Sequence, residues 1–148
     1  MKKWIIRIIV AGILIGGATV LYIFNAPHRN AQNIDAEFTI NASALAFEFI
    51  NDKNLANNTY LSEDGDSKVG IVVGEIVETG ENAKGETYVI LKNNNQEVGV
   101  QCAFTEKLEL TIGSTLKVKG VIRSGAEYDE DFEEYIDVIM EQCAIINN

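Results

Sequence analysis

The chain has 148 residues, enough for one compact domain after an N-terminal segment of about 30 residues, and a second domain is not expected. Beyond Arg29 the sequence carries eight Lys and Arg residues against 22 Asp and Glu residues, a net charge of −14. A field of that sign repels phosphate backbones and anionic lipid head groups, which disfavours nucleic-acid binding and favours cationic partners.

An apolar run from Trp4 to Phe24 contains one charged residue, Arg7, near its N-terminal end. As a helix, this run would span roughly 31 Å, the thickness of a hydrocarbon core. It predicts a transmembrane helix within residues 1–25. A cleaved signal peptide is the alternative, but the small residues that mark a cleavage site are not found at the end of the run. Gly12 and Gly16 have the spacing that lets two helices approach, although glycine is common in such spans.

Basic residues are unevenly distributed about the apolar run. Lys2 and Lys3 precede it, whereas His28 and Arg29 are the basic side chains that follow it closely. Because positive residues favour the cytoplasmic side, the N-terminus is predicted in the cytoplasm and the rest of the chain outside it, in a bacterial envelope.

Residues 26–36 are predicted to form a spacer, because Pro27 ends a helix, and residues 37–148 to form the folded domain. Asn41 is a suitable N-cap for a helix that runs to about Asn57. The expected buried stripe of this helix is Ala42, Leu45, Ala46, Phe49 and Ala56, and Phe47 is also assigned to packing.

After Tyr60 the apolar period changes from helical to two, which predicts strands. Gly74 lies within the first strand, where a bend or bulge is expected, and a second bulge is expected near Glu141 and Gln142. Residues 125–134 are predicted to form an acidic loop. The five expected strands are Lys68–Glu78, Thr87–Lys92, Glu97–Phe104, Thr115–Ile122 and Tyr135–Ile146. Their side chains Val73, Val100, Phe104 and Val118 are expected to point into one core.

This pattern predicts a mainly β fold, a five-stranded OB-fold Greek-key barrel with a preceding α-helix, in addition to the transmembrane helix. Several short segments, taken in order, also resemble one family of OB-fold proteins, the tRNA_anti-like family, which is found chiefly in bacteria and often carries an N-terminal membrane span. The segments are Pro27-His28-Arg29, Asn41–Phe49, Ala56–Leu61, Val72–Ile76, Gly99–Phe104, Gly113-x-x-x-Lys117-Val118-Lys119-Gly120, and Cys143.

The resemblance implies a nucleic-acid or other oligomeric ligand, because the family name records similarity to anticodon-binding domains. The charge and the long acidic loop of this chain depart from that expectation. An OB face that stacks bases or sugars needs exposed aromatic side chains near basic ones. The candidates are Tyr88, Lys92, Lys117, Lys119, Arg123 and Tyr128, although Tyr88 could instead belong to the core.

No catalytic constellation is found in the sequence, so the chain is not expected to be an enzyme. Its single histidine, His28, has no cysteine or carboxylate close to it in sequence, which argues against a triad or a zinc site. The acidic runs lack the spacing of a calcium loop. No cofactor and no metal are therefore expected.

Two hypotheses for the function remain. The leading one is a binding module, anchored in the membrane, for a protein, peptide or glycan whose identity the sequence does not give. The alternative is an OB domain that binds nucleic acid through the lysines of the fourth strand. Cys102 and Cys143 are expected to form a disulfide, because the predicted topology places the domain in an oxidising compartment. The alternative is two buried free thiols that behave as small hydrophobic side chains.

Overall fold

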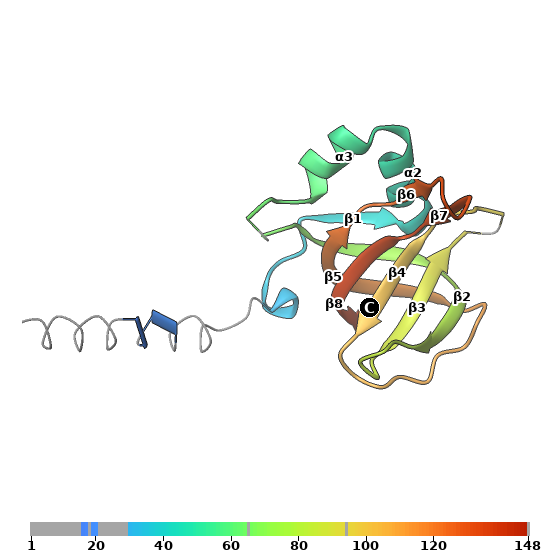
Figure 1. Ribbon diagram of the computed structural model, residues 1–148. Coiled ribbons are helices and arrows are strands. Elements are labelled where there is room, and N and C mark those ends of the chain that lie inside the picture. Colours follow the sequence, from blue (N-terminus) through green and yellow to red (C-terminus); the bar gives the residue numbers. More distant parts are fainter. Residues whose placement is uncertain (1–15, 18, 21–29, 65, 94, 148) are drawn as a thin grey trace, which may run out of the picture.

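The computed structural model describes residues 16, 17, 19, 20, 30–64, 66–93 and 95–147 (Figure 1). Of the residues predicted for the membrane span, Gly16 is helical, whereas Trp4, Arg7, Gly12 and Phe24 lie outside the described residues. Within the described ranges, no helix combines the length and the hydropathy that a membrane crossing requires.

Five strands form a closed barrel, as the sequence predicts. The strands follow the order β2-β3-β4-β8-β5, and the pairing of β5 with β2 closes the barrel. Strands β4 and β8 run parallel to each other, and the other four pairs of barrel strands are antiparallel. This arrangement is consistent with an OB fold. The strands are β2 (Val69–Glu81), β3 (Thr87–Lys92), β4 (Val100–Phe104), β5 (Thr115–Ser124) and β8 (Val138–Ile145).

Strand β2 changes its pairing partner next to Gly74, the glycine at which the sequence predicts a bend or bulge. Its first half pairs with β5 and its second half with β3, and the two ladders meet at Glu75. A Cβ atom on Gly74 would lie 3.0 Å from the Cβ atoms of Ala42 and Leu91, so the glycine lets α2 (Ala42–Asn51) and β3 approach the bend. Val72 faces the core and Val73 does not, which corrects the expectation that Val73 is a core residue.

Two helices cover one end of the barrel (Figure 1). The prediction of one helix from Asn41 to Asn57 is wrong, because the structure has two helices, α2 (Ala42–Asn51) and α3 (Lys53–Tyr60). Asp52 lies between them as the C-cap of α2 and the N-cap of α3, where its Oδ1 accepts a hydrogen bond from the N–H of Leu55. Asn41 is the N-cap of α2, as expected, and its Oδ1 accepts a hydrogen bond from the N–H of Ser43 at 3.0 Å. All five residues of the predicted stripe are buried: Ala42, Leu45, Ala46, Phe49 and Ala56.

Phe47 lies on the outer surface of α2 with 61% of its area exposed, so the prediction that it packs in the core is wrong. It falls between the turns of the buried stripe, and two phenylalanines at positions i and i+2 of a helix point in different directions. Phe49, which the sequence also assigns to packing, is buried as predicted.

Four short elements were not expected from the sequence. The 3-10 helix η1 (Ala31–Asn33) lies in the predicted spacer, and β1 (Phe38–Asn41) pairs in parallel with β2. The predicted acidic loop contains β6 (Glu127–Asp129) and β7 (Glu134–Ile136), which form a separate antiparallel pair. Elements of three or four residues give too short a pattern to be read from sequence.

Tyr60 joins the helical cap to the barrel. Its ring contacts Phe38 and Phe49, with centroid distances of 4.9 and 5.8 Å, and its hydroxyl donates a hydrogen bond of 2.7 Å to Oε2 of Glu48. Burial and this carboxylate raise the pKa of Tyr60 to about 12. The folded state therefore keeps a proton that the unfolded chain loses near pH 10.

This difference predicts that the stabilisation due to the neutral Tyr60 hydroxyl is complete below pH 10 and is lost as the pH rises toward 12. Urea denaturation at pH 8, 10 and 11.5 should show a steeper loss of stability in the wild type than in Tyr60→Phe. Parallel pH profiles of the two proteins would contradict the assignment.

Candidate functional site

A surface cavity of the described structure begins at an irregularity in β8. Gln142 has a φ angle of 53°, in the left-handed region that is uncommon for residues other than glycine. The pairing of β8 shifts register here against both β4 and β5, which confirms the predicted bulge near Glu141 and Gln142. The bulge turns the Gln142 side chain away from the barrel core.

Gln142 holds the segment that precedes the barrel. Its Oε1 atom accepts a hydrogen bond of 2.8 Å from the N–H of Ala31, and its carbonyl accepts one of 2.6 Å from Nε2 of Gln32. Lys119 donates from Nζ to the carbonyl of Gln32 at 3.2 Å. Ala31 is buried by these contacts. The part of the predicted spacer that the structure describes is thus docked on β5 and β8.

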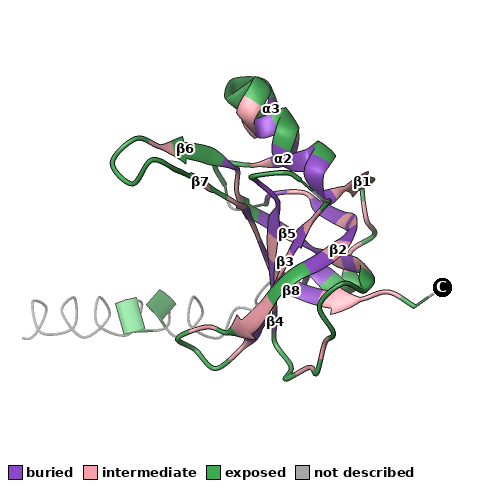
Figure 2. Ribbon diagram, turned by 90° about the vertical axis from the view of Figure 1, so that its right-hand side faces the viewer, coloured by how far each residue is buried: buried purple, intermediate pink, exposed green. Residues whose placement is uncertain are grey.

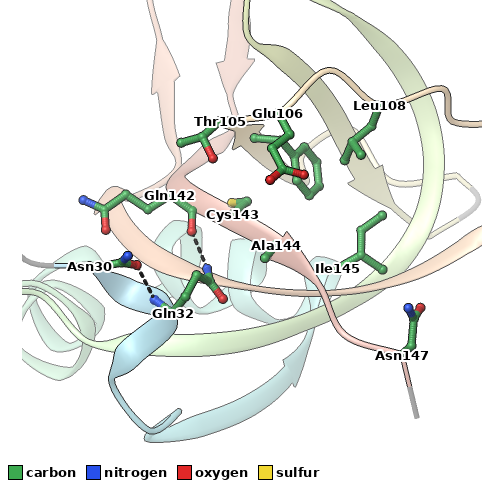
Figure 3. Close-up of a pocket in the computed structure, with 11 residues that line it drawn as sticks. Asn30, Gln32, Thr105, Glu106, Leu108, Gln142, Cys143, Ala144, Ile145 and Asn147 are labelled. Carbon is green, nitrogen blue, oxygen red and sulfur yellow. Dashed lines mark hydrogen bonds between the residues drawn. The ribbon is translucent and has the colours of Figure 1, made fainter.

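The docked segment and the chain that follows β4 enclose a groove of about 790 Å³. Its floor contains apolar side chains, among them the buried Phe104 and the partly buried Leu108 and Ile145. Figure 3 shows the remaining lining residues, which carry amide, hydroxyl, carboxylate, thiol and methyl groups: Asn30, Gln32, Thr105, Glu106, Gln142, Cys143, Ala144 and Asn147. None of the described lining residues is a lysine or an arginine. The groove, named here the amide groove, is therefore uncharged apart from one carboxylate.

Several polar groups of the amide groove remain available to a ligand. Among the hydrogen bonds between described residues, none uses Nε2 of Gln142, Oε1 of Gln32 or the hydroxyl of Thr105. An apolar floor with a few converging polar groups is the usual composition of a ligand site. The groove can hold an uncharged ligand by apolar contact and by hydrogen bonds in both directions.

The residues predicted to bind a ligand do not converge. Tyr88 and Lys92 lie on the outer face of β3, Tyr128 lies on β6, and the other three lie on β5. Strands β3 and β5 are not neighbours in the barrel. The three residues on β5 are Lys117, Lys119 and Arg123.

Most of these side chains are engaged within the protein. The Tyr88 hydroxyl donates to Oε1 of Glu78 at 2.8 Å, and this hydrogen bond raises the pKa of Tyr88. Lys92 Nζ donates to the carbonyl of Glu97 at 2.9 Å and lies 3.7 Å from a carboxylate oxygen of Asp137. Arg123 Nε donates to Oε2 of Glu141 at 3.0 Å. Lys119 is held by Gln32, as described above.

The outer face of β3, β4 and β8, where OB barrels commonly bind oligomers, has little positive charge in this chain. Of the described residues whose side chains point outward from these strands, only Lys92 is basic. The other outward side chains near the centre of this face are Tyr88, Ile90, Gln101, Ala103 and Ile139.

The two cysteines lie on neighbouring barrel strands, and both are buried free thiols in the structure. Cys143 follows the bulge and pairs with Phe104, so its side chain is directed to the barrel interior near Cys102. Burial, followed by a hydrogen bond with Cys102, raises the pKa of the Cys143 thiol. A disulfide between them stays a prediction.

A scan against family models matches the tRNA_anti-like family over residues 1–130. The chain belongs to this family. The tRNA_anti-like match and the closed barrel agree on the fold that the sequence predicts. The match ends within the acidic segment, so Gln142 and the rest of β8 lie beyond the matched residues. A comparison with curated proteins finds none that matches the chain.

Sequence reasoning did not find the amide groove. Its two sides are 111 residues apart in the hydrogen bond from Ala31 to Gln142, and no local pattern reports such a contact. The one available signal was the predicted bulge near Gln142, because bulges often redirect side chains next to functional sites.

Proposed function

We propose that this tRNA_anti-like protein is a membrane-anchored binding module that displays its barrel outside the cytoplasm and holds a protein, peptide or glycan ligand in the amide groove. The observation that carries the proposal is the composition of the groove. An apolar floor formed by Phe104 and Leu108 adjoins amides and a hydroxyl, and no described lining residue is cationic. Peptide backbones and sugars present the matching amide and hydroxyl groups.

The charge of the chain supports this choice over nucleic acid. Contacts of Lys and Arg with phosphates supply most of the non-specific affinity for nucleic acid. On β5, Lys119 contacts a carbonyl and Arg123 contacts a carboxylate, and Lys92 on β3 lies beside Asp137. The strongly negative net charge adds a repulsive field. Binding without catalysis is proposed, since the sequence offers no paired nucleophile and base.

Binding should be tested with the full chain in detergent micelles against a printed peptide array, a glycan array and a single-stranded DNA of twelve thymidines. Thr105→Trp would fill the mouth of the groove from an exposed position, and Ala83→Trp places the same bulk in the exposed turn between β2 and β3. A groove ligand should lose about tenfold or more in affinity with the first variant and little with the second.

Salt-sensitive binding of the DNA outside the groove would contradict the proposal. If the DNA binds at physiological salt, weakens as salt is added and is unaffected by Thr105→Trp, the nucleic-acid function is correct and the groove is not the site.

The proposed location rests on the basic residues Lys2 and Lys3 and on the apolar run between Trp4 and Phe24. Protease added to intact spheroplasts should therefore remove the barrel domain while a cytoplasmic marker protein stays whole. A domain that is degraded only after the membrane is lysed would place it in the cytoplasm.

A further inference from the structure

A two-stranded hairpin, residues 127–136, stands away from the barrel (Figure 2). It shares no residue with the lining of the amide groove. Tyr128 and Tyr135 are paired across its strands, with their ring centroids 4.9 Å apart in an edge-to-face arrangement. At its base, a salt bridge joins Glu127 to Lys53 of α3. The hairpin is thus an ordered projection with its own cross-strand contacts.

The tip of the hairpin presents an aromatic side chain to solvent. Oδ1 of Asp129 accepts hydrogen bonds from the N–H groups of Asp131 and Phe132, at 2.9 and 3.3 Å, which fix the turn. Phe132 is 75% exposed, more than any other large hydrophobic side chain of the described residues. Tyr128, on the adjoining strand, is 50% exposed. Large aromatic side chains held out on a fixed turn are the usual anchors of protein interfaces.

The charge around Phe132 identifies the kind of partner. Six of the ten residues of hairpin 127–136 are acidic and none is basic. In the described structure, the salt bridges of the hairpin include only Glu127, and no three of its carboxylates are placed to hold a metal ion. A second copy of this chain, an anionic membrane and a nucleic acid all carry charge of the same sign as the hairpin. A positively charged polypeptide is the complementary partner.

We propose that hairpin 127–136 is a docking surface for a basic segment of another protein, which receives the Phe132 ring in an apolar contact while its Lys or Arg residues face the surrounding carboxylates. This surface is separate from the amide groove and from the ligand proposed there.

The test uses the full chain in uncharged detergent micelles and three synthetic peptides of twelve residues. The first combines Lys and Leu, the second replaces each Leu by Ser, and the third replaces each Lys by Glu. Phe132→Ser is compared with Phe47→Ser, which removes a phenylalanine of similar exposure from α2. Affinity is measured by fluorescence anisotropy at several salt concentrations.

The wild type should bind the Lys/Leu peptide. Phe132→Ser should lower the affinity for this peptide about tenfold or more, whereas Phe47→Ser should change it less than about twofold. The Ser peptide should bind more weakly and the Glu peptide should not bind. Equal effects of the two Phe substitutions, or no binding of the Lys/Leu peptide at low salt, would overturn the proposal.

A charge series separates the hairpin from the overall field of the protein. One triple variant neutralises three carboxylates of the hairpin: Glu130→Gln, Asp131→Asn and Glu133→Gln. A control triple variant removes the same charge from exposed sites elsewhere: Glu63→Gln, Asp64→Asn and Glu109→Gln. The hairpin variant should lose more affinity for the Lys/Leu peptide than the control, and its affinity should depend less on salt. Equal effects of the two triple variants would show attraction by net charge alone. If Phe132→Ser instead abolishes self-association in the absence of peptide, the occupant is a second copy and the proposal fails.

Discussion

Replacement of Phe104 by alanine should lower the free energy of unfolding by about 3–5 kcal/mol. Phe104 ends β4, is 1% exposed and pairs with Cys143 on β8 where the bulge shifts the register. The truncated side chain would leave a cavity between the barrel core and the amide groove, because its neighbours belong to strands paired on both sides and cannot collapse freely. Urea denaturation of the full chain in detergent measures the effect.

Phe47→Ala is the matched control for this substitution. It removes the same ring from a site that is 61% exposed on α2, so a change of less than about 0.5 kcal/mol is expected. If the two substitutions have equal effects, Phe104 does not occupy the core as the structure places it.

A disulfide between Cys102 and Cys143 should raise the free energy of unfolding by roughly 4 kcal/mol over the reduced protein, because it closes a loop of about 40 residues. Both thiols are buried on neighbouring strands, and the pKa of Cys143 is raised, so the folded reduced protein has little reactive thiolate. The bridge should therefore form while the chain folds in an oxidising compartment, with an oxidised dithiol protein accepting the two electrons.

Thiol counting under denaturing, non-reducing conditions decides this prediction for protein isolated from its native cells. No free thiol and a monomeric mass would support the bridge, and two free thiols per chain would refute it. Cys102→Ser with Cys143→Ser provides the unbridged reference for denaturation, and it should match the wild type after reduction if the bridge is the source of the difference.

The sequence predicted most of the barrel because its strands alternate between buried and exposed positions. Val100, Cys102 and Phe104 of β4 follow that alternation and are all buried, and the bulge in β8 is visible as a change of phase. The run Ile71-Val72-Val73 has no polar position, so it could not show which valine faces the core. The helix break at Asp52 was missed because one residue both ends α2 and caps α3.

The candidate sites were harder to predict because they depend on contacts between distant residues. The basic residues of β5 suggested a ligand face from their spacing, but the structure directs Lys119 to Gln32 and Arg123 to Glu141. The acidic segment is predicted as a loop because high negative charge is typical of a solvated loop. Its cross-strand pair, Tyr128 with Tyr135, forms a hairpin in spite of that charge.

The most direct test of the binding-module account is photo-crosslinking in living cells. A benzophenone amino acid is placed at Thr105, on the rim of the amide groove, and separately at Leu55, which is 64% exposed on α3. If the amide groove binds the ligand, a discrete, nuclease-resistant adduct with a protein, peptide or glycan should form at Thr105, and no matching adduct should form at Leu55. Equal adducts at both positions, or an adduct at Thr105 that nuclease removes, would contradict the binding-module account.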